Sequence, residues 1–102
     1  IKLKPINVNL IDLLWKRDTN SNNKPFYLIE DKDAGSNIKK KLVKLIKLIK
    51  LNKVNYLFIT APENIAWLLN IRGDDIDYSP LPNSHAVIKE DGKILLFCDL
   101  TK

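Results

Sequence analysis

The sequence is poor in residues on which many small catalytic and binding sites depend: it has one cysteine, one histidine, three glycines and no methionine. Cys98 has no partner for an internal disulfide and follows an apolar run, so we expect a buried thiol that serves packing. The glycines Gly35, Gly73 and Gly92 are isolated from one another. This spacing excludes a glycine-rich loop that would cradle phosphate, and the sequence also lacks a Gly-x-Ser-x-Gly nucleophile elbow.

Long apolar runs are missing as well. No stretch of about 18 uncharged apolar residues occurs, and no signal-peptide pattern is present. A length of 102 residues with 45% hydrophobic and 28% charged residues is typical of one globular domain. We therefore expect a single cytoplasmic domain without membrane contact. Because the chain starts at Ile1 and lacks methionine, we also expect it to be a piece of a longer protein.

Arginine is scarce although the formal net charge is +5. Only Arg17 and Arg72 can form the planar, bidentate fork that base recognition favours. The other basic residues are lysines, and Lys, Asn and Ile are together the residues of A/T-only codons. A base-composition bias in the gene could therefore produce this charge, which alone is weak evidence for a nucleic-acid partner.

The first 30 residues read as a lead-in followed by a docking strand. Asn9 is a good N-cap residue and Asp12 lies in the first turn, which predicts a short helix over residues 10–15. The polar residues 18–23 are typical of a turn, and residues 25–29 read as an extended segment. We thus divide the single domain into residues 1–30, the lead-in and first strand, and residues 31–102, an α/β body.

The strongest periodic signal predicts an amphipathic helix that begins after Ser36, its expected N-cap, and ends near Asn52. Its apolar stripe contains Ile38, Leu42, Leu45, Ile46 and Ile49. Its opposite face contains Lys39, Lys40, Lys44, Lys47 and Lys50. Three interpretations of the lysine face compete: a solvated face of a helix that covers a sheet, a membrane-surface helix, and a phosphate-binding stripe. We favour the first, since a helix in an α/β domain usually covers a sheet with one apolar stripe.

The remaining segments predict strands around a second helix. Residues 54–60 are typical of a strand buried between layers, and Pro62 begins a helix that Asn70 and Gly73 bring to an end. Residues 85–90 and 93–98 flank Asp91 and Gly92, which predicts a β-hairpin with a two-residue turn. A strand after a helix is half of a βαβ unit, so we expect an α/β fold with a mixed β-sheet flanked by helices.

Acidic residues and the only histidine follow the second helix. Asp74, Asp75 and Asp77 with His85 could be imagined as metal ligands. No Cys or His pair has a metal-binding spacing, and the calcium-loop pattern fails, so we predict no metal site. Arg72 is expected either to pair with Asp74 or Asp75 or to point at a carboxylate elsewhere. His85 is either a core residue at the start of a strand or a pocket residue that titrates near neutral pH.

This region resembles a known family. The letters AWLLNIRGDDI at residues 66–76, Pro80 and SHAVI at residues 84–88 are similar to the pattern IAWLxNxRGxDIxxxPxxxSxAxI. That pattern belongs to the second, creatinase-N-like domain of three-domain Xaa-Pro aminopeptidases (aminopeptidase P). The letters NLIDLLW at residues 9–15 resemble the family's lead-in NLVDxIW, and residues 94–99 resemble its LFxD strand.

The resemblance has two departures: the family commonly has an aromatic residue where His85 stands, and Ala34-Gly35 keeps only part of a YxG pattern. It implies a creatinase/prolidase N-terminal-domain-like fold with a ribonuclease H-like motif. It further implies that catalysis belongs to a pita-bread domain that follows in sequence and binds two divalent metal ions, usually manganese. The fragment alone should be inactive, without catalytic or metal-binding residues of its own.

The implied role is that of a wall of the active-site cleft. The parent enzyme would hydrolyse the bond between an N-terminal residue and a following proline. The partners would be its own upstream and catalytic domains and a proline-containing peptide, with a second copy in a homodimer as a further option. The candidates for cleft or interface contacts are Arg72, Asp74, Tyr78 and His85. The alternative function is a basic α/β module that binds nucleic acid or an anionic surface through the lysine-rich helix from Lys39 to Lys53.

Overall fold

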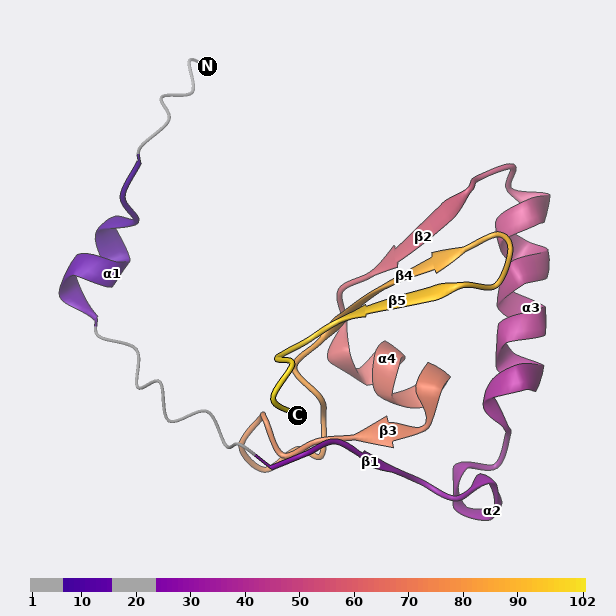
Figure 1. The fold of residues 1–102 in the computed structure, drawn as a ribbon, viewed down its shortest axis with the longest axis horizontal. Coiled ribbons are helices and arrows are strands. Elements are labelled where there is room, and N and C mark those ends of the chain that lie inside the picture. Colours follow the sequence, from indigo (N-terminus) through magenta and orange to yellow (C-terminus); the bar gives the residue numbers. More distant parts are fainter. Residues whose placement is uncertain (1–6, 16–23) are drawn as a thin grey trace.

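The computed structural model describes residues 7–15 and 24–102 (Figure 1). The predicted turn at residues 18–23 and Arg17 lie outside the described residues. The elements in chain order are α1 (Leu10–Leu14), β1 (Tyr27–Leu28), α2 (Asp31–Ala34), α3 (Ile38–Leu51), β2 (Tyr56–Ile59), α4 (Pro62–Leu69), β3 (Ile71–Arg72), β4 (His85–Lys89) and β5 (Ile94–Phe97). Helix α1 lies apart from the other elements in Figure 1, and none of its residues is buried.

The strands form two antiparallel sheets. One has the order β2-β4-β5, and the other pairs β1 with β3, so that Tyr27 lies opposite Arg72. The predicted α/β fold class is confirmed, but the strand directions differ from the mixed sheet that we expected. Every strand pair within the described ranges is antiparallel, because α4, β3 and the loop of residues 73–84 return the chain against β2 rather than alongside it. The division of the domain at residue 30 stays a prediction.

The core lies where α3 and α4 pack on the inner face of the three-stranded sheet. Ile65 and Leu68 of α4, Ile49 of α3 and Ala86 and Ile88 of β4 are buried together. The predicted apolar stripe of α3 is confirmed in that Leu42 and Leu45 also pack against this cluster, which is the pattern of a helix covering a sheet.

Helix α3 begins one residue later than predicted. Its N-cap is Asn37, whose side-chain oxygen accepts a hydrogen bond from the backbone N–H of Lys40 at 2.9 Å. Ser36 and Asn37 are both good N-cap residues, so local propensity does not choose between them. The backbone carbonyl of Ser36 instead accepts a hydrogen bond from Asn70.

The hairpin of β4 and β5 is confirmed, but its loop is one residue longer than predicted. Ile88 lies opposite Ile94, and the backbone N–H of Lys89 donates to the carbonyl of Lys93 at 2.9 Å. The loop therefore holds three residues, 90–92. Gly92 has a φ of 89°, which is the left-handed residue that a three-residue hairpin loop requires.

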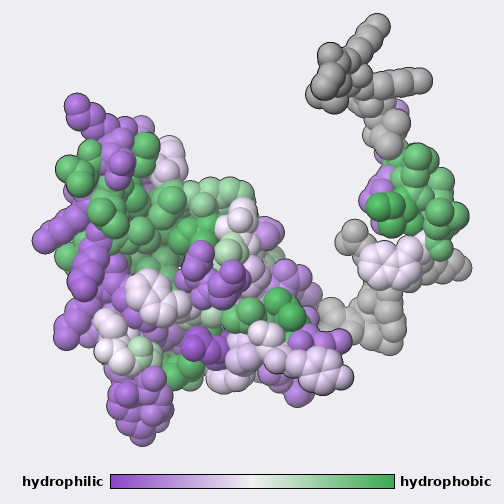
Figure 2. All heavy atoms as spheres, turned by 180° about the vertical axis from the view of Figure 1, so that it is seen from behind, coloured by the Kyte–Doolittle hydropathy of each residue, from purple (hydrophilic) through white to green (hydrophobic). Residues whose placement is uncertain are grey.

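The outer face of the sheet is largely uncovered, which corrects our expectation that residues 54–60 are buried between layers. Tyr56 and Phe58 of β2 are 59% and 60% exposed, and Phe97 of β5 is 54% exposed. Cys98, expected to be buried, is partly exposed. In Figure 2 apolar atoms gather on the body beside the lysine-rich α3, and a second apolar group marks α1. No helix within residues 7–15 and 24–102 is long and apolar enough to cross a bilayer.

Candidate functional site in the segment after helix α4

Helix α4 ends at Asn70, a buried residue that connects four segments of the chain. Asn70 has the left-handed backbone conformation with φ of 51° and ψ of 32° and is 3% exposed. Its amide nitrogen donates to the carbonyl oxygen of Ser36 at 3.1 Å and to a carboxylate oxygen of Asp31 at 3.4 Å. Its own backbone carbonyl accepts from the N–H of Ile29 at 2.8 Å. Asn70 therefore fixes α4 against β1, α2 and α3.

Lys41 is the buried cation beside Asn70, and it is only 4% exposed. Its ammonium donates hydrogen bonds to the backbone carbonyl of Trp67 and to the side-chain oxygen of Asn70, and it lies 4.6 Å from the centre of the Trp67 ring. Burial lowers the pKa of Lys41, the positive charge of Arg72 lowers it further, and Asp31 partly opposes this shift.

The sequence carries a signal for Lys41 that a simple division of the helix into an apolar stripe and a lysine face leaves out. On a helical wheel Lys41 lies about 40° from Leu45, at the border of the apolar stripe. A lysine at such a border can bury its aliphatic stem along the stripe. Its ammonium then needs acceptors, and the end of α4 supplies them.

Arg72 closes the end of α4 from the other side. Its Nη1 atom donates to the carbonyl oxygens of Ala66 at 3.1 Å and Ile71 at 2.9 Å. The predicted alternatives, a pair with Asp74 or Asp75 or a more distant carboxylate, are therefore wrong. The last carbonyls of a helix lack partners within the helix, and a guanidinium both satisfies them and suits the negative end of the helix dipole.

Gly73 lies where β1 and the start of the loop pack most closely. A Cβ atom on Gly73 would lie 2.9 Å from the ring of Phe26 and 3.1 Å from the Cα atom of Pro82. Real Cβ contacts are longer than this, and the backbone at Pro82 has little freedom to move. Only glycine fits between these two segments without displacing them.

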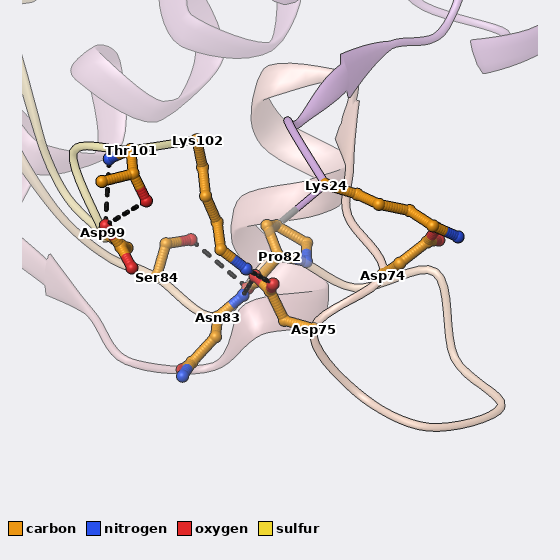
Figure 3. Close-up of polar contacts among 9 residues, drawn as sticks. All are labelled: Lys24, Asp74, Asp75, Pro82, Asn83, Ser84, Asp99, Thr101 and Lys102. Atoms are coloured by element: carbon orange, nitrogen blue, oxygen red, sulfur yellow. Dashed lines mark hydrogen bonds and ion pairs between the residues drawn. The ribbon is translucent and has the colours of Figure 1, made fainter. Parts of the chain in front are cut away.

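Asp75 holds the base of the loop. One carboxylate oxygen accepts the backbone N–H of Asn83 at 2.8 Å, and the other accepts the ammonium of Lys102, which points at Asp75 in Figure 3. Each of the two charged side chains is 5% exposed. Asp75 is not among the four candidates that the sequence suggested. Its partner Lys102 is 27 positions away in sequence, so no local pattern identifies the pair.

Beyond Asp75 the loop turns outward. Ile76 and Ser79 form an isolated antiparallel bridge, and the N–H of Ser79 donates to the carbonyl of Ile76 at 3.1 Å. At the tip, Tyr78 has a positive φ of 61° and a fully exposed side chain. Asp74 pairs with Lys24 at 3.0 Å on the surface (Figure 3). We call residues 76–79 the loop tip.

His85 begins β4 on the exposed outer face of the sheet. Its ring meets the ring of Phe58 edge-on, with the ring centres 6.0 Å apart. The interpretation of His85 as a core residue is therefore wrong. The structure does not bring the four candidates into one cluster, since Arg72 contacts α4, Asp74 contacts Lys24, Tyr78 faces solvent and His85 contacts β2. Across the described ranges, no three His, Cys, Asp or Glu side chains gather in a way that could hold a metal ion.

Comparison with known proteins agrees with this architecture. The family model of the creatinase/prolidase N-terminal domain matches residues 17–102. A probable Xaa-Pro aminopeptidase P of Colletotrichum graminicola is 34% identical over 101 residues, which are 98% of this chain and 16% of that protein. The Xaa-Pro aminopeptidase of Drosophila melanogaster is 35% identical over 103 residues, which are 99% of this chain and 16% of the relative.

A solved structure shows the same fold. It is the crystal structure of the X-prolyl aminopeptidase of Caenorhabditis elegans, described as a cytosolic enzyme with a di-nuclear active site. The likeness has a TM-score of 0.85 at 32% identity and covers 95% of this chain and 16% of that enzyme. The chain thus spans about one sixth of the proteins it matches. These matches confirm the resemblance seen in residues 66–88, and the chain belongs to the creatinase/prolidase N-terminal domain family, in the form found in Xaa-Pro aminopeptidases.

Proposed function

We propose that the chain is a non-catalytic domain of a proline-specific metalloaminopeptidase. The longer protein would hydrolyse the bond between an N-terminal residue and a following proline. The observation that carries this proposal is the match of 95% of the chain, at a TM-score of 0.85, to 16% of an X-prolyl aminopeptidase. In agreement with a supporting role, Asn70 and Arg72 of the motif bind neighbouring segments of the domain itself.

The reaction centre would lie in a separate domain. The described part of the chain does not fit a di-nuclear centre, because it contains no cluster of three possible metal ligands. We propose that two divalent ions, expected to be manganese, belong to the catalytic domain, and that the whole enzyme is cytoplasmic like the relative from C. elegans. The role of this chain would then be to limit by shape which peptide ends reach that centre.

The loop tip is the part of this chain that we assign to the cleft. Tyr78 projects fully into solvent from a base that is held by Gly73 and Asp75, so a neighbouring domain or a bound peptide can contact it. Asp74 lies beside this tip, and its ion pair with Lys24 keeps it near the surface. Arg72 would act indirectly, by holding the end of α4.

The outer sheet face and α1 are proposed as contacts with the upstream and catalytic domains or with a second copy. His85, Phe58 and Phe97 lie on the same exposed face of the sheet. On α1, Leu13 is 69% and Leu14 is 92% exposed. Contiguous exposed apolar surface of this kind marks an interaction site in a globular protein.

A peptidase assay tests the proposal. The chain alone should not cleave Xaa-Pro peptides when manganese is added, whereas the longer protein should. In the longer protein, Tyr78→Ala should lower kcat/KM about tenfold without loss of bound metal. Lys47→Ala, on the exposed side of α3, is the control and should leave kcat/KM unchanged. Cleavage by the chain alone, or normal kinetics of the Tyr78 variant, would contradict the proposal.

The alternative function, a nucleic-acid or anionic-surface module, is favoured by one observation. Lys39, Lys40 and Lys47 are exposed along one side of α3. If this side binds phosphates, the affinity for a random DNA duplex must fall steeply with salt, with a slope set by the phosphates contacted. A duplex titration at several salt concentrations decides this, because a solvated lysine face gives no saturable binding at physiological salt.

A further inference from the structure

The loop between β3 and β4 is closed by a buried ion pair that spans a long stretch of sequence. The carboxylate of Asp75 accepts from the backbone N–H of Asn83 and from the ammonium of Lys102. Asp75 thereby connects the beginning of the loop, the end of the loop and the segment that follows β5. A carboxylate and an ammonium that are each 5% exposed are costly to leave unpaired, so each strongly constrains the other.

The segment after β5 is shaped so that Lys102 reaches Asp75. A carboxylate oxygen of Asp99 accepts from the backbone N–H of Thr101 at 2.9 Å and from its hydroxyl at 2.8 Å. These hydrogen bonds lower the pKa of Asp99 and so favour its charged form. The backbone N–H of Lys102 donates to the carbonyl of Asp99 at 3.3 Å, which completes the turn (Figure 3). The Lys102 ammonium also lies 5.9 Å from the ring of Phe26.

The loop tip depends on this base. Within the loop, the N–H of Leu81 donates to the carbonyl of Ser79 at 2.8 Å, and the N–H of Gly73 donates to the carbonyl of Pro80 at 3.4 Å. These contacts give the loop its local shape. The direction in which the shaped tip leaves the domain is set where both of its ends meet Asp75.

We propose that Asp75, through its ion pair with Lys102, is a positioning residue that fixes the direction in which the loop tip presents Tyr78. The inference rests on the proposed function, because it is the peptide or the neighbouring domain that would contact Tyr78. It adds that the end of the β4–β5 hairpin is coupled to the same surface. A change at Lys102, far from Tyr78 in sequence, should therefore change what Tyr78 does.

The first experiment uses the chain itself and does not depend on any enzyme activity. Asp75→Asn keeps an acceptor for the Asn83 N–H and loses the charge that holds Lys102. The exchange of the Ser79, Leu81 and Asn83 amides should become about tenfold faster, whereas exchange in the core of α3 should not change. Asp74→Asn is the matched control, because its ion pair with Lys24 is exposed. Unchanged exchange in the loop of the Asp75 variant would overturn the inference.

A second variant covers the case in which a lone buried charge unfolds the chain. Asp75→Asn combined with Lys102→Met removes both charges, which proteins tolerate better than the loss of one partner. The double variant should recover the fold and keep the faster exchange in residues 79–83. Recovery of the fold with wild-type exchange in these residues would also overturn the inference.

The second experiment is a mutant cycle on kcat/KM in the longer peptidase. Asp75→Asn and Tyr78→Ala should each lower kcat/KM about tenfold, and the double variant should be no worse than Tyr78→Ala alone. Losses that multiply would show that Asp75 acts independently of Tyr78, and normal kinetics of Asp75→Asn beside an impaired Tyr78→Ala would do the same. If Tyr78→Ala alone is normal, the role assigned to the tip fails, while amide exchange still decides whether Asp75 holds the loop.

Discussion

The segment after α4 consists of two neighbouring parts that face opposite ways. Residues 66–75 point inward: Asn70 is 3% exposed, and the side chain of Asp75 is 5% exposed. The loop tip, residues 76–79, points outward, and Tyr78 is fully exposed. The comparison teaches that one continuous sequence motif combines two tasks, since its first part joins the pieces of the domain and its second part is free to contact something else. Substitutions in the two parts should separate stability from activity.

The largest loss of stability is expected from Gly73→Ala. The new Cβ would lie 2.9 Å from the Phe26 ring and 3.1 Å from the Pro82 backbone, so β1 or the loop must move. Overpacking of this kind costs about 3 kcal/mol of the free energy of unfolding. Urea denaturation measures it. Gly35→Ala is the control, because open space surrounds Gly35 and its φ of 70° costs only about 1 kcal/mol. Equal losses for the two variants would contradict the close packing at Gly73.

The next effect is expected at Asn70, where a substitution series can separate backbone from side chain. Asn70→Ala should lower the free energy of unfolding by about 2–3 kcal/mol, since it removes the hydrogen bonds to Ser36 and Lys41 and strains the left-handed backbone. Asn70→Gly relieves only the strain and should recover about 1 kcal/mol. Thermal denaturation of both variants checks this. No difference between them would mean that backbone conformation contributes nothing at this position.

A smaller effect is expected from Lys41, and it depends on pH. The folded state lowers the pKa of Lys41 below its ordinary value of 10.5, so the unfolded chain binds more protons in the window between the two values. The free energy of unfolding should therefore rise with pH in that window, and below it the charged amine makes the folded state less favourable. Lys41→Met should remove this part of the pH dependence. Lys44→Met, at an exposed position of the same helix, should keep it, and urea denaturation at a series of pH values compares the two.

These effects also show what the sequence could and could not predict. Helix α3, helix α4 and the β4–β5 hairpin carry local signals, namely a period of apolar residues, Pro62 at a helix start and an Asp-Gly turn, and all three elements are predictable from them. The antiparallel direction of β4 against β2 is not, because it depends on the path of the loop between them. The pair of Asp75 and Lys102 escapes prediction for the same reason.

The exposed outer face of the sheet could not be predicted from the pattern either. Tyr56 and Phe58 alternate with the inward-facing Leu57 and Ile59, and all four are apolar. A run that is apolar on both faces is typical of a strand with layers on both sides. The described chain supplies only the inner layer, so the sequence carried information about a contact that lies outside this structure.

The smallest effect on stability is expected from Tyr78→Ala. The side chain is fully exposed, so its removal takes no packing away from the domain, and the free energy of unfolding should change by less than about 0.5 kcal/mol. Comparing urea denaturation of Tyr78→Ala with that of Gly73→Ala measures how sharply the two parts of the motif differ. A large loss of stability in the Tyr78 variant would mean that the tip packs on the domain. The small loss expected here makes any change in peptide cleavage attributable to a lost contact at the tip, because a domain that remains folded cannot lower kcat/KM through unfolding.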